Sequence, residues 1–539
     1  MNGAGPVAVG VTPAEQLQRR PLLFAALEAA LPVRFEGRAP GELRGLDAVL
    51  MLSETAEPTP PSGIPSLWLA TAESQAEGEA MPNALADMRK LDQRLRGASL
   101  PDNRLGTALG EAPKIAAGEN ATVLAASSGT PTWVCDRDGE RALLIPAELG
   151  AREALRERLC DRRSAALLPL LHFLREQTDS IRWRPAAARA SLLFDDPNLH
   201  WPSYGFVKLA DLGEHARSHG YHVALATVPL DAWFAHPAAL RALKASAGAI
   251  SLLVHGNDHD GAELGRQESE PEAIALAAQA LRRVEAFGRR TGVAVDRVMV
   301  PPHEACSRGT ARALRRCGFE AISMTRPCPW LEWEPHSWLA RPEPVDPLVA
   351  WDPAAFVEGL PLLLRHPLAQ RSSAELALRA FLDQPLILYG HHDDLLDGPE
   401  ALLGAVEEVN RLAPTRWCSL SEIAATSFET RTQGSHLAVR LLTRKARIDV
   451  PSGVTQLTVQ TPASGPDPEQ QLLSIDGEGA GLGEPVPIEP GSSIEVTLSP
   501  PDAIDVDSVP SPRRRPLAVA RRLASEGRDR LQPLASRAR

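Results

Sequence analysis

Short apolar runs alternate with stretches of helical periodicity between residues 189 and 427. Within the helical stretches, such as Glu272–Arg289, apolar residues recur every three or four positions, which is typical of amphipathic helices. This alternation indicates repeated βαβ units, and about 240 residues is the size of one (β/α) barrel. The predicted barrel strands are Ala190–Phe194, His222–Val228, Ile250–Val254, Val298–Val300, Ala321–Met324 and Pro385–Tyr389.

The regions on either side of this stretch have different patterns. Residues 1–183 predict an α/β domain, in which the helical stretch Ala14–Leu31 separates two strands and Arg152–Glu176 forms one or two further helices. Residues 431–505 alternate with period two, which predicts a small antiparallel, sandwich-like β module. The strands expected in the first region are Val7–Val11, Ala48–Leu52, Leu67–Ala70, Ala121–Ala126, Thr132–Cys135 and Ala142–Ile145.

The predicted fold class is therefore α/β: a distorted (β/α) barrel of about seven strands at 184–430, between the N-terminal α/β domain and the β module. Residues 506–539 follow as a basic tail. Its part from Ser511 onward carries nine arginines against Glu526 and Asp529. Because its apolar positions are few and are interrupted by Gly527 and Pro533, we expect this tail to be disordered.

Composition excludes several classes of protein. The net charge of -11 argues against a nucleic-acid partner, which would need a basic face. The six cysteines are scattered without a CxxC pair, which argues against a disulfide framework and a thiolate zinc site. No apolar run is long enough for a transmembrane segment, and the first residues lack the layout of a signal peptide. We expect a soluble, cytoplasmic protein, and the oligomeric state stays open.

Polar groups follow four of the predicted barrel strands. Barrel enzymes place their active site at the carboxyl ends of the strands, so this register predicts an active site there. Two histidines four residues apart, His255 and His259, could share one metal ion if a helix began just after His255. The other groups are Asp195 with Asp196, the run from Pro301 to Glu304, and the run from Gly390 to Asp394.

The pair Asp195 and Asp196 together with His255 and His259 resembles the motifs of polysaccharide deacetylases. These are the NodB-homology proteins of carbohydrate esterase family 4, within the wider glycoside hydrolase/deacetylase barrel superfamily. The resemblance covers the barrel only and implies that Asp195 is the general base, while Asp196, His255 and His259 hold a divalent metal. A histidine after the last strand would be the general acid, and of the catalytic candidates His391 and His392 we favour His391.

The sequence departs from the family pattern at three positions. Pro197 follows the aspartate pair where the family has glycine, and Gly256 follows the first histidine where the family has serine or threonine. Val300 occupies the place of an arginine that orients the base. The same third motif corresponds to the segment that includes Pro302 and His303, which we expect to contact substrate.

Two imidazoles and one carboxylate leave open positions on a divalent ion, which is the arrangement of a catalytic site. Zinc is the default, although nitrogen and oxygen ligands also suit cobalt, nickel, iron or manganese. Trp330 and Trp333 lie in a proline-rich stretch after a barrel strand, where indoles either stack on sugar rings or pack a loop onto the barrel.

The leading hypothesis is a metal-dependent hydrolase that deacetylates an N-acetylated sugar or polysaccharide. One alternative is hydrolysis of another non-peptide carbon–nitrogen bond, or of a glycoside, at the same site. A second alternative, of a different class, is a non-catalytic glycan-binding or scaffold protein that retains the barrel.

Overall fold

The structure is a computed structural model of the 539-residue chain. Its contacts divide the chain into two compact units. One contains the described residues up to Arg184 together with Ser372–Leu382, and the other contains the remaining described residues from Pro185 onward. The structure describes residues 5–53, 59, 61–71, 78–137, 139–144, 159, 164, 167–266, 269–325, 355–461, 471–512, 518–522, 524 and 527.

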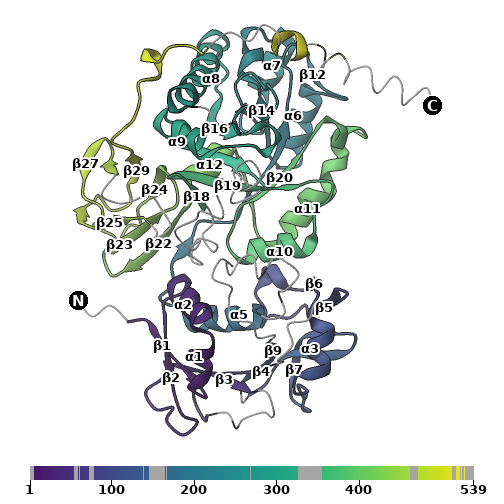
Figure 1. Cartoon of the computed structure of the whole chain (residues 1–539), viewed down its shortest axis with the longest axis vertical. Coiled ribbons are helices and arrows are strands. Elements are labelled where there is room, and N and C mark those ends of the chain that lie inside the picture. The colour runs from purple at the N-terminus through teal and green to yellow at the C-terminus, as the bar shows by residue number, and fades with distance from the viewer. Residues whose placement is uncertain are drawn as a thin grey trace, which may run out of the picture. The chain divides into compact units, whose positions relative to one another are not determined.

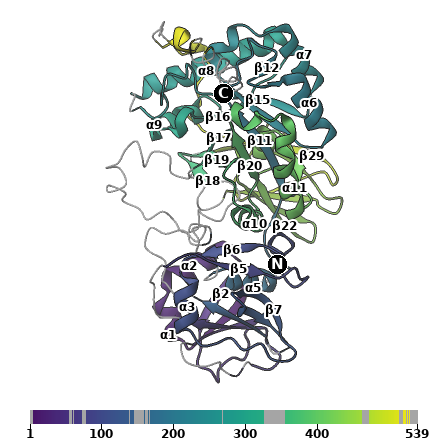
Figure 2. The same cartoon turned by 90° about the vertical axis from the view of Figure 1, so that its right-hand side faces the viewer.

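Seven parallel strands form a closed barrel in the second unit (Figures 1 and 2). Their order is β14-β15-β16-β17-β19-β20-β11, and β11 also pairs with β14, which closes the sheet. The predicted fold class is confirmed, including the number of strands. The strands are β11 (Arg189–Asp195), β14 (Val223–Thr227), β15 (Ile250–His255), β16 (Asp296–Val300), β17 (Ala321–Met324), β19 (Leu360–Pro367) and β20 (Leu386–Gly390).

Small and branched side chains fill the centre of this barrel. Leu193, Ala224, Leu253, Val298 and Leu363 come from five different strands and belong to one buried cluster. Because all strands run in the same direction and are buried on both faces, they are almost wholly apolar, as the sequence predicted for six of them. The seventh strand, β19, was not predicted.

Helices cover the outside of the barrel. The longest, α8 (Glu270–Thr291), begins with a capping box between Ser269 and Glu272 and ends at Gly292, whose φ of 71° suits the left-handed helix end. Its buried positions recur every three or four residues, as the sequence predicted. The others are α6 (Leu209–Ser218), α7 (Pro237–Ala245), α9 (Arg308–Arg316), α11 (Leu403–Leu412) and α12 (Leu420–Ala425). Within the described residues, none of the helices combines the length and the apolarity that crossing a membrane requires.

A nine-stranded sheet in the order β2-β1-β3-β4-β9-β8-β7-β5-β6 forms the N-terminal unit. The predicted helix Ala14–Leu31 is two helices, α1 (Glu15–Arg19) and α2 (Pro21–Ala30), because Pro21 cannot continue the hydrogen bonding of the first. The strands are β1 (Val7–Thr12), β2 (Val33–Gly37), β3 (Ala48–Ser53), β4 (Ser66–Thr71), β5 (Met81–Leu85), β6 (Ser99–Asp102), β7 (Thr122–Ser127), β8 (Thr130–Cys135) and β9 (Glu140–Leu144).

A helix from far along the chain completes the core of this unit. Helix α10 (Ser373–Phe381) lies between two barrel strands in the sequence, yet Phe381 is buried in the N-terminal core. It lies there with residues of α5 (Leu168–Gln177), and Arg94 donates to the carbonyl of Ala380 at 2.7 Å. A further helix, α3 (Leu105–Glu111), belongs to the same unit.

The C-terminal β module has two sheets around one apolar cluster. We expected it to be antiparallel, and this is wrong for one pair, because β23 runs parallel to β25. One sheet contains β22 (Phe428–Gln433), β23 (His436–Leu441), β25 (Gln456–Gln460) and β28 (Pro485–Pro487). The other contains β24 (Lys445–Asp449), β29 (Ser493–Ser499), β26 (Leu472–Ile475) and β27 (Glu478–Ala480).

One buried histidine makes the stability of the barrel depend on pH. His222, next to β14, is buried, its Nδ1 lies 3.1 Å from the Ser191 hydroxyl, and burial lowers its pKa to about 4. The unfolded chain takes up this proton near pH 6.5, so the contribution of neutral His222 is complete above that pH and is lost as the pH falls towards 4.

We therefore expect the free energy of unfolding to fall by about 2 kcal/mol more in the natural protein than in His222→Gln between about pH 7 and pH 5. Urea unfolding followed by tryptophan fluorescence at both pH values measures the difference. Parallel pH profiles for the two proteins would contradict the assignment.

Candidate active site

The polar residues at the strand ends lie at one edge of the barrel. Asp195 is the last residue of β11 and His255 is the last residue of β15. Pro301 follows β16 and His391 follows β20. Because the strands are parallel, these carboxyl ends share one edge, as the sequence analysis expected.

Asp196, His255 and His259 converge at this edge. One ligand atom from each lies within 4.8 Å of the others, and in the described part of the chain no other set of three such residues does so. The Nε2 atom of His255 is 3.8 Å from Oδ2 of Asp196, and the Nε2 atom of His259 is 3.3 Å from Oδ1. The three predicted metal ligands therefore face one another.

The hydrogen bonding of His255 fits a cation between these residues. Its Nδ1 lies 2.8 Å from the carbonyl oxygen of Val300, which can only accept, so Nδ1 carries the hydrogen and Nε2 presents a lone pair to Asp196. Burial lowers the pKa of His255, against the opposing effect of the Asp196 carboxylate, and this favours the neutral ring. Two acceptors then face each other, and a divalent ion would satisfy both.

The surroundings of Asp196 favour its charged form, which is the form that binds a cation. Burial raises its pKa, but the neighbouring histidines and Arg522 outweigh burial and hold that pKa well below its usual range. Burial lowers the pKa of His259, but the hydrogen bond with the Asp196 carboxylate raises it by more, so the pKa of His259 lies above its usual value. The cluster therefore keeps a carboxylate that is ready to bind a cation.

A tight loop, not a helix, brings His259 to the site. The carboxylate oxygen Oε1 of Glu263 accepts from the backbone N–H groups of Asn257, Asp258 and His259 at 2.6, 3.0 and 2.9 Å. The prediction of a helix just after His255 is therefore wrong. The backbone N–H groups donate to the Glu263 side chain instead of to the carbonyl groups of a helix.

Gly256 is required by the same loop. Its φ is 61°, and a Cβ atom there would collide with the Glu263 carboxylate and lie 2.7 Å from Cγ of Pro302. A Cβ atom does not fit at this position, so the loop excludes serine and threonine here.

Asp195 is held by an arginine that the sequence analysis did not find. The Nη1 atom of Arg365, on β19, lies 2.8 and 2.9 Å from the two carboxylate oxygens of Asp195. The Nε atom of Arg365 donates to Glu304 at 2.9 Å, and the Arg365 side chain is only 2% exposed. Position 300 is a valine, and the arginine that contacts Asp195 comes from β19 instead. A charged residue at the end of the apolar run LPLLL was the signal that could have identified it.

The structure separates the two histidines after β20. The Nε2 atom of His391 lies 4.0 Å from Oδ2 of Asp195, and its side chain is 54% exposed. The ring of His392 instead packs against Tyr204 and Phe206, with centroid distances of 6.3 and 6.0 Å. Of the two histidines, His391 is therefore the one that lies beside Asp195 with its side chain open to solvent.

The predicted substrate contacts are only partly described. Pro302 is buried in a short 3-10 helix, and the ring centroid of His303 lies 5.3 Å from that of His259. His303 is therefore beside the cluster. Trp330 and Trp333 lie outside the described residues.

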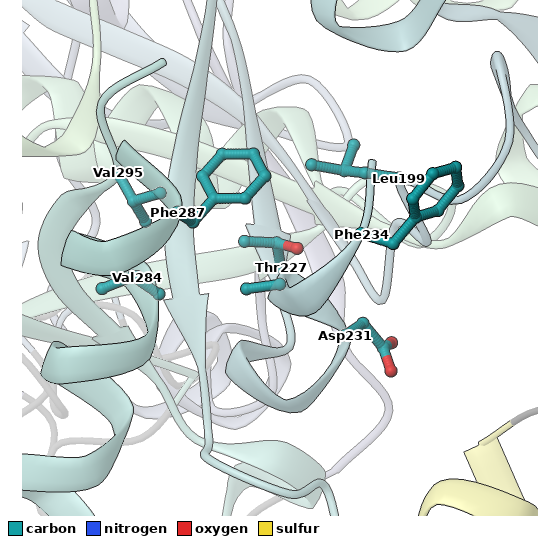
Figure 3. Close-up of a pocket in the computed structure, with 8 residues that line it drawn as sticks. Leu199, Thr227, Asp231, Phe234, Val284, Phe287 and Val295 are labelled. Carbon is teal, nitrogen blue, oxygen red and sulfur yellow. The ribbon is translucent and has the colours of Figure 1, made fainter. Parts of the chain in front are cut away.

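A second set of groups, missed by the sequence analysis, follows β14. The 3-10 helix Pro229–Trp233 carries Asp231, whose Oδ2 accepts from Arg522 of the basic tail at 2.7 Å. Figure 3 shows Asp231 beside a small pocket with apolar walls. Those walls include Leu199, Phe234, Val284, Phe287 and Val295.

Comparison with known proteins gives likenesses to solved structures only. No family model matches the chain, and no curated protein matches it. A family 4 carbohydrate esterase from Streptomyces lividans is 14% identical, with coverage of 43% of this chain and 93% of that chain and a TM-score of 0.25. The Xyl-CE4 domain of a xylanase from the hindgut metagenome of Trinervitermes trinervoides is 11% identical (42% and 82%; TM-score 0.24). A proposed polysaccharide deacetylase from Mycobacterium smegmatis is 15% identical (46% and 95%; TM-score 0.31). Likenesses this distant transfer no activity to this chain.

Proposed function

We propose that this chain is a metal-dependent hydrolase that removes the acetyl group from an N-acetylated sugar or polysaccharide. The observation that carries the proposal is the cluster of Asp196, His255 and His259, whose ligand atoms lie within 4.8 Å of one another. Asp195, which directly precedes Asp196 in the sequence, supplies a buried carboxylate beside this cluster. Two imidazoles and one carboxylate with open positions suit a catalytic divalent ion, for which zinc is the default.

In this proposal, Asp196, His255 and His259 would hold a divalent ion, which would supply Lewis-acid chemistry for the acetyl carbonyl and the attacking water at neutral pH. The protein's residues move the protons. Asp195 accepts the proton of the attacking water, and Arg365 keeps its carboxylate in one orientation. His391, 4.0 Å from Asp195, donates a proton to the departing amine.

Exposed aromatic rings near the site support a carbohydrate substrate. Trp233 is 64% exposed and packs with Phe234 and His200 at centroid distances of 5.8 and 4.9 Å. These residues follow β14 and β11, at the carboxyl edge of the barrel where the cluster lies. Indole faces that stay open to solvent suit stacking on the apolar face of a sugar ring.

The test compares the natural protein, loaded with zinc, and its Asp195→Asn variant on a panel of N-acetylated sugars and oligosaccharides. We expect the variant to release acetate at least about 100-fold more slowly, because a positioned base contributes this much. Asp397→Asn makes the same chemical change at an exposed position outside the site and should leave the rate unchanged. Equal rates for the natural protein and Asp195→Asn would remove Asp195 as the base. No acetate release from any substrate would overturn the proposed activity.

A further inference from the structure

The C-terminal basic segment reaches the candidate metal ligands. Residues 518–522 are helical, although the sequence predicted a tail without fixed structure. The Nη1 atom of Arg522 lies 3.0 Å from Oδ1 of Asp196, and its Nη2 atom lies 2.7 Å from Oδ2 of Asp231. The Arg522 side chain is 11% exposed, so the guanidinium is enclosed between the two carboxylates.

Further contacts hold this segment in place. Arg521 pairs with the carboxylate of Asp260, and its Nη2 lies 3.4 Å from the carbonyl oxygen of His259. Ala518 is buried. In Figure 3 the carboxylate of Asp231 points away from the apolar walls of the pocket, towards the yellow ribbon of the C-terminal segment.

Arg522 and a metal ion would use the same carboxylate oxygen. Oδ1 of Asp196 lies 3.3 Å from Nε2 of His259 and 3.0 Å from the Arg522 guanidinium. A divalent ion among the three ligands would lie within a few ångströms of this guanidinium, in a partly buried place where like charges repel strongly. The two cations therefore oppose each other at Asp196.

Asp231 gives the guanidinium a second partner. The Asp231 side chain is 8% exposed, and among the described residues only Arg522 forms an ion pair with it. Burying a carboxylate without a partner is costly, so Asp231 favours the docked position of Arg522. Asp231 is not a member of the ligand cluster, which means that it stabilises the segment without helping the metal.

We propose that the C-terminal segment around Arg522 is an intramolecular competitor for the cation of this site. With its guanidinium on Asp196 and Asp231, Arg522 occupies a carboxylate oxygen that the cation would use, and metal binding releases Arg522 from Asp196. This inference rests on the proposed function, because it needs a metal at the cluster. It adds a regulatory contact to that function.

The test measures the dissociation constant for Zn²⁺ by titration calorimetry of the full chain at low ionic strength. Losing one charge-assisted contact should make Arg522→Gln bind Zn²⁺ about tenfold more tightly than the natural protein. Arg521→Gln is the matched control: it removes the same charge from the neighbouring residue, which contacts no predicted ligand side chain. Its affinity should stay within about twofold of the natural value, because Arg521 is half exposed and an ion pair in contact with water contributes little.

Hydrogen exchange provides a second measurement. In the natural protein, the backbone amides of residues 518–522 should exchange faster after Zn²⁺ is added, because the segment loses its contact with Asp196. Equal or weaker binding by Arg522→Gln, or unchanged exchange, would overturn the competition while leaving the proposed function intact. If neither the natural protein nor Arg522→Gln binds Zn²⁺, the metal site itself is absent and both proposals fail.

Discussion

Replacing His255 by Gln should weaken Zn²⁺ binding by at least about 100-fold, the largest effect that we expect at the site. His255 is buried, and its Nδ1 hydrogen bond to Val300 fixes the direction of Nε2 towards Asp196. A glutamine has no nitrogen lone pair to present in that direction. Calorimetric titration of the purified variant measures the loss, and circular dichroism establishes whether the fold is retained.

His303→Gln is the matched control for this substitution. The ring of His303 packs against His259, but His303 is not one of the three clustered ligands. We expect its Zn²⁺ affinity to stay within about fivefold of the natural value, below the roughly 10- to 100-fold loss caused by removing a hydrogen-bond partner of a ligand, because His303 contacts His259 by ring packing. Tight binding by His255→Gln would show that the ion binds elsewhere.

Replacing Arg365 by Met should lower the free energy of unfolding by about 3 to 5 kcal/mol. The Arg365 guanidinium is buried against Asp195 and Glu304, so its removal leaves the buried Asp195 carboxylate without that partner. The loss of stability comes from the Asp195 carboxylate, which is then charged and buried without its arginine and cannot be stabilised by water. Urea unfolding of the full chain measures the change in stability.

Two further variants separate this explanation from simple loss of packing. Adding Asp195→Asn to Arg365→Met should recover part of the loss, because the stranded charge is then gone. Arg371→Met removes a more exposed arginine that pairs with Glu408, and it should cost less than about 1 kcal/mol. If the double variant is no more stable than Arg365→Met, the charge explanation is wrong.

The barrel was predictable because its strands carry their signal locally. A strand such as β15 is apolar except for Ser251 and stops at His255, and such a pattern is typical of strands that are buried on both faces. Strand β19 also begins with an apolar run, but Pro361 and Pro367 lie near its two ends. Because prolines are typical of loops, the segment was not predicted as a strand. Because β19 was not predicted, Arg365, which lies on this strand, was not predicted as a site residue.

The site was predictable in its residues and less so in its geometry. Spacing alone suggested that His255 and His259 belong together, but it suggested a helix between them. The actual loop depends on Glu263, whose carboxylate collects three backbone donors. Arg522 is the extreme case, because it contacts Asp196 from far along the chain and a single sequence contains no signal for such a pairing.

The N-terminal sheet shows where local signals are weakest. Strands β2 and β6 lie at the two edges of the sheet, and β5 and β6 each contain a proline, so their patterns are short and interrupted. They form because neighbouring strands offer unpaired backbone groups. That information belongs to the tertiary structure and not to the segment.

Helix α10 has a consequence for the order in which the protein matures. Phe381 belongs to the core of the N-terminal unit, although most of the barrel strands precede it in the chain. During translation the ribosome must therefore deliver most of the barrel before the first unit can close its interior. The barrel needs β20, which follows α10 directly in the chain, so neither unit can be completed until this one stretch has been made.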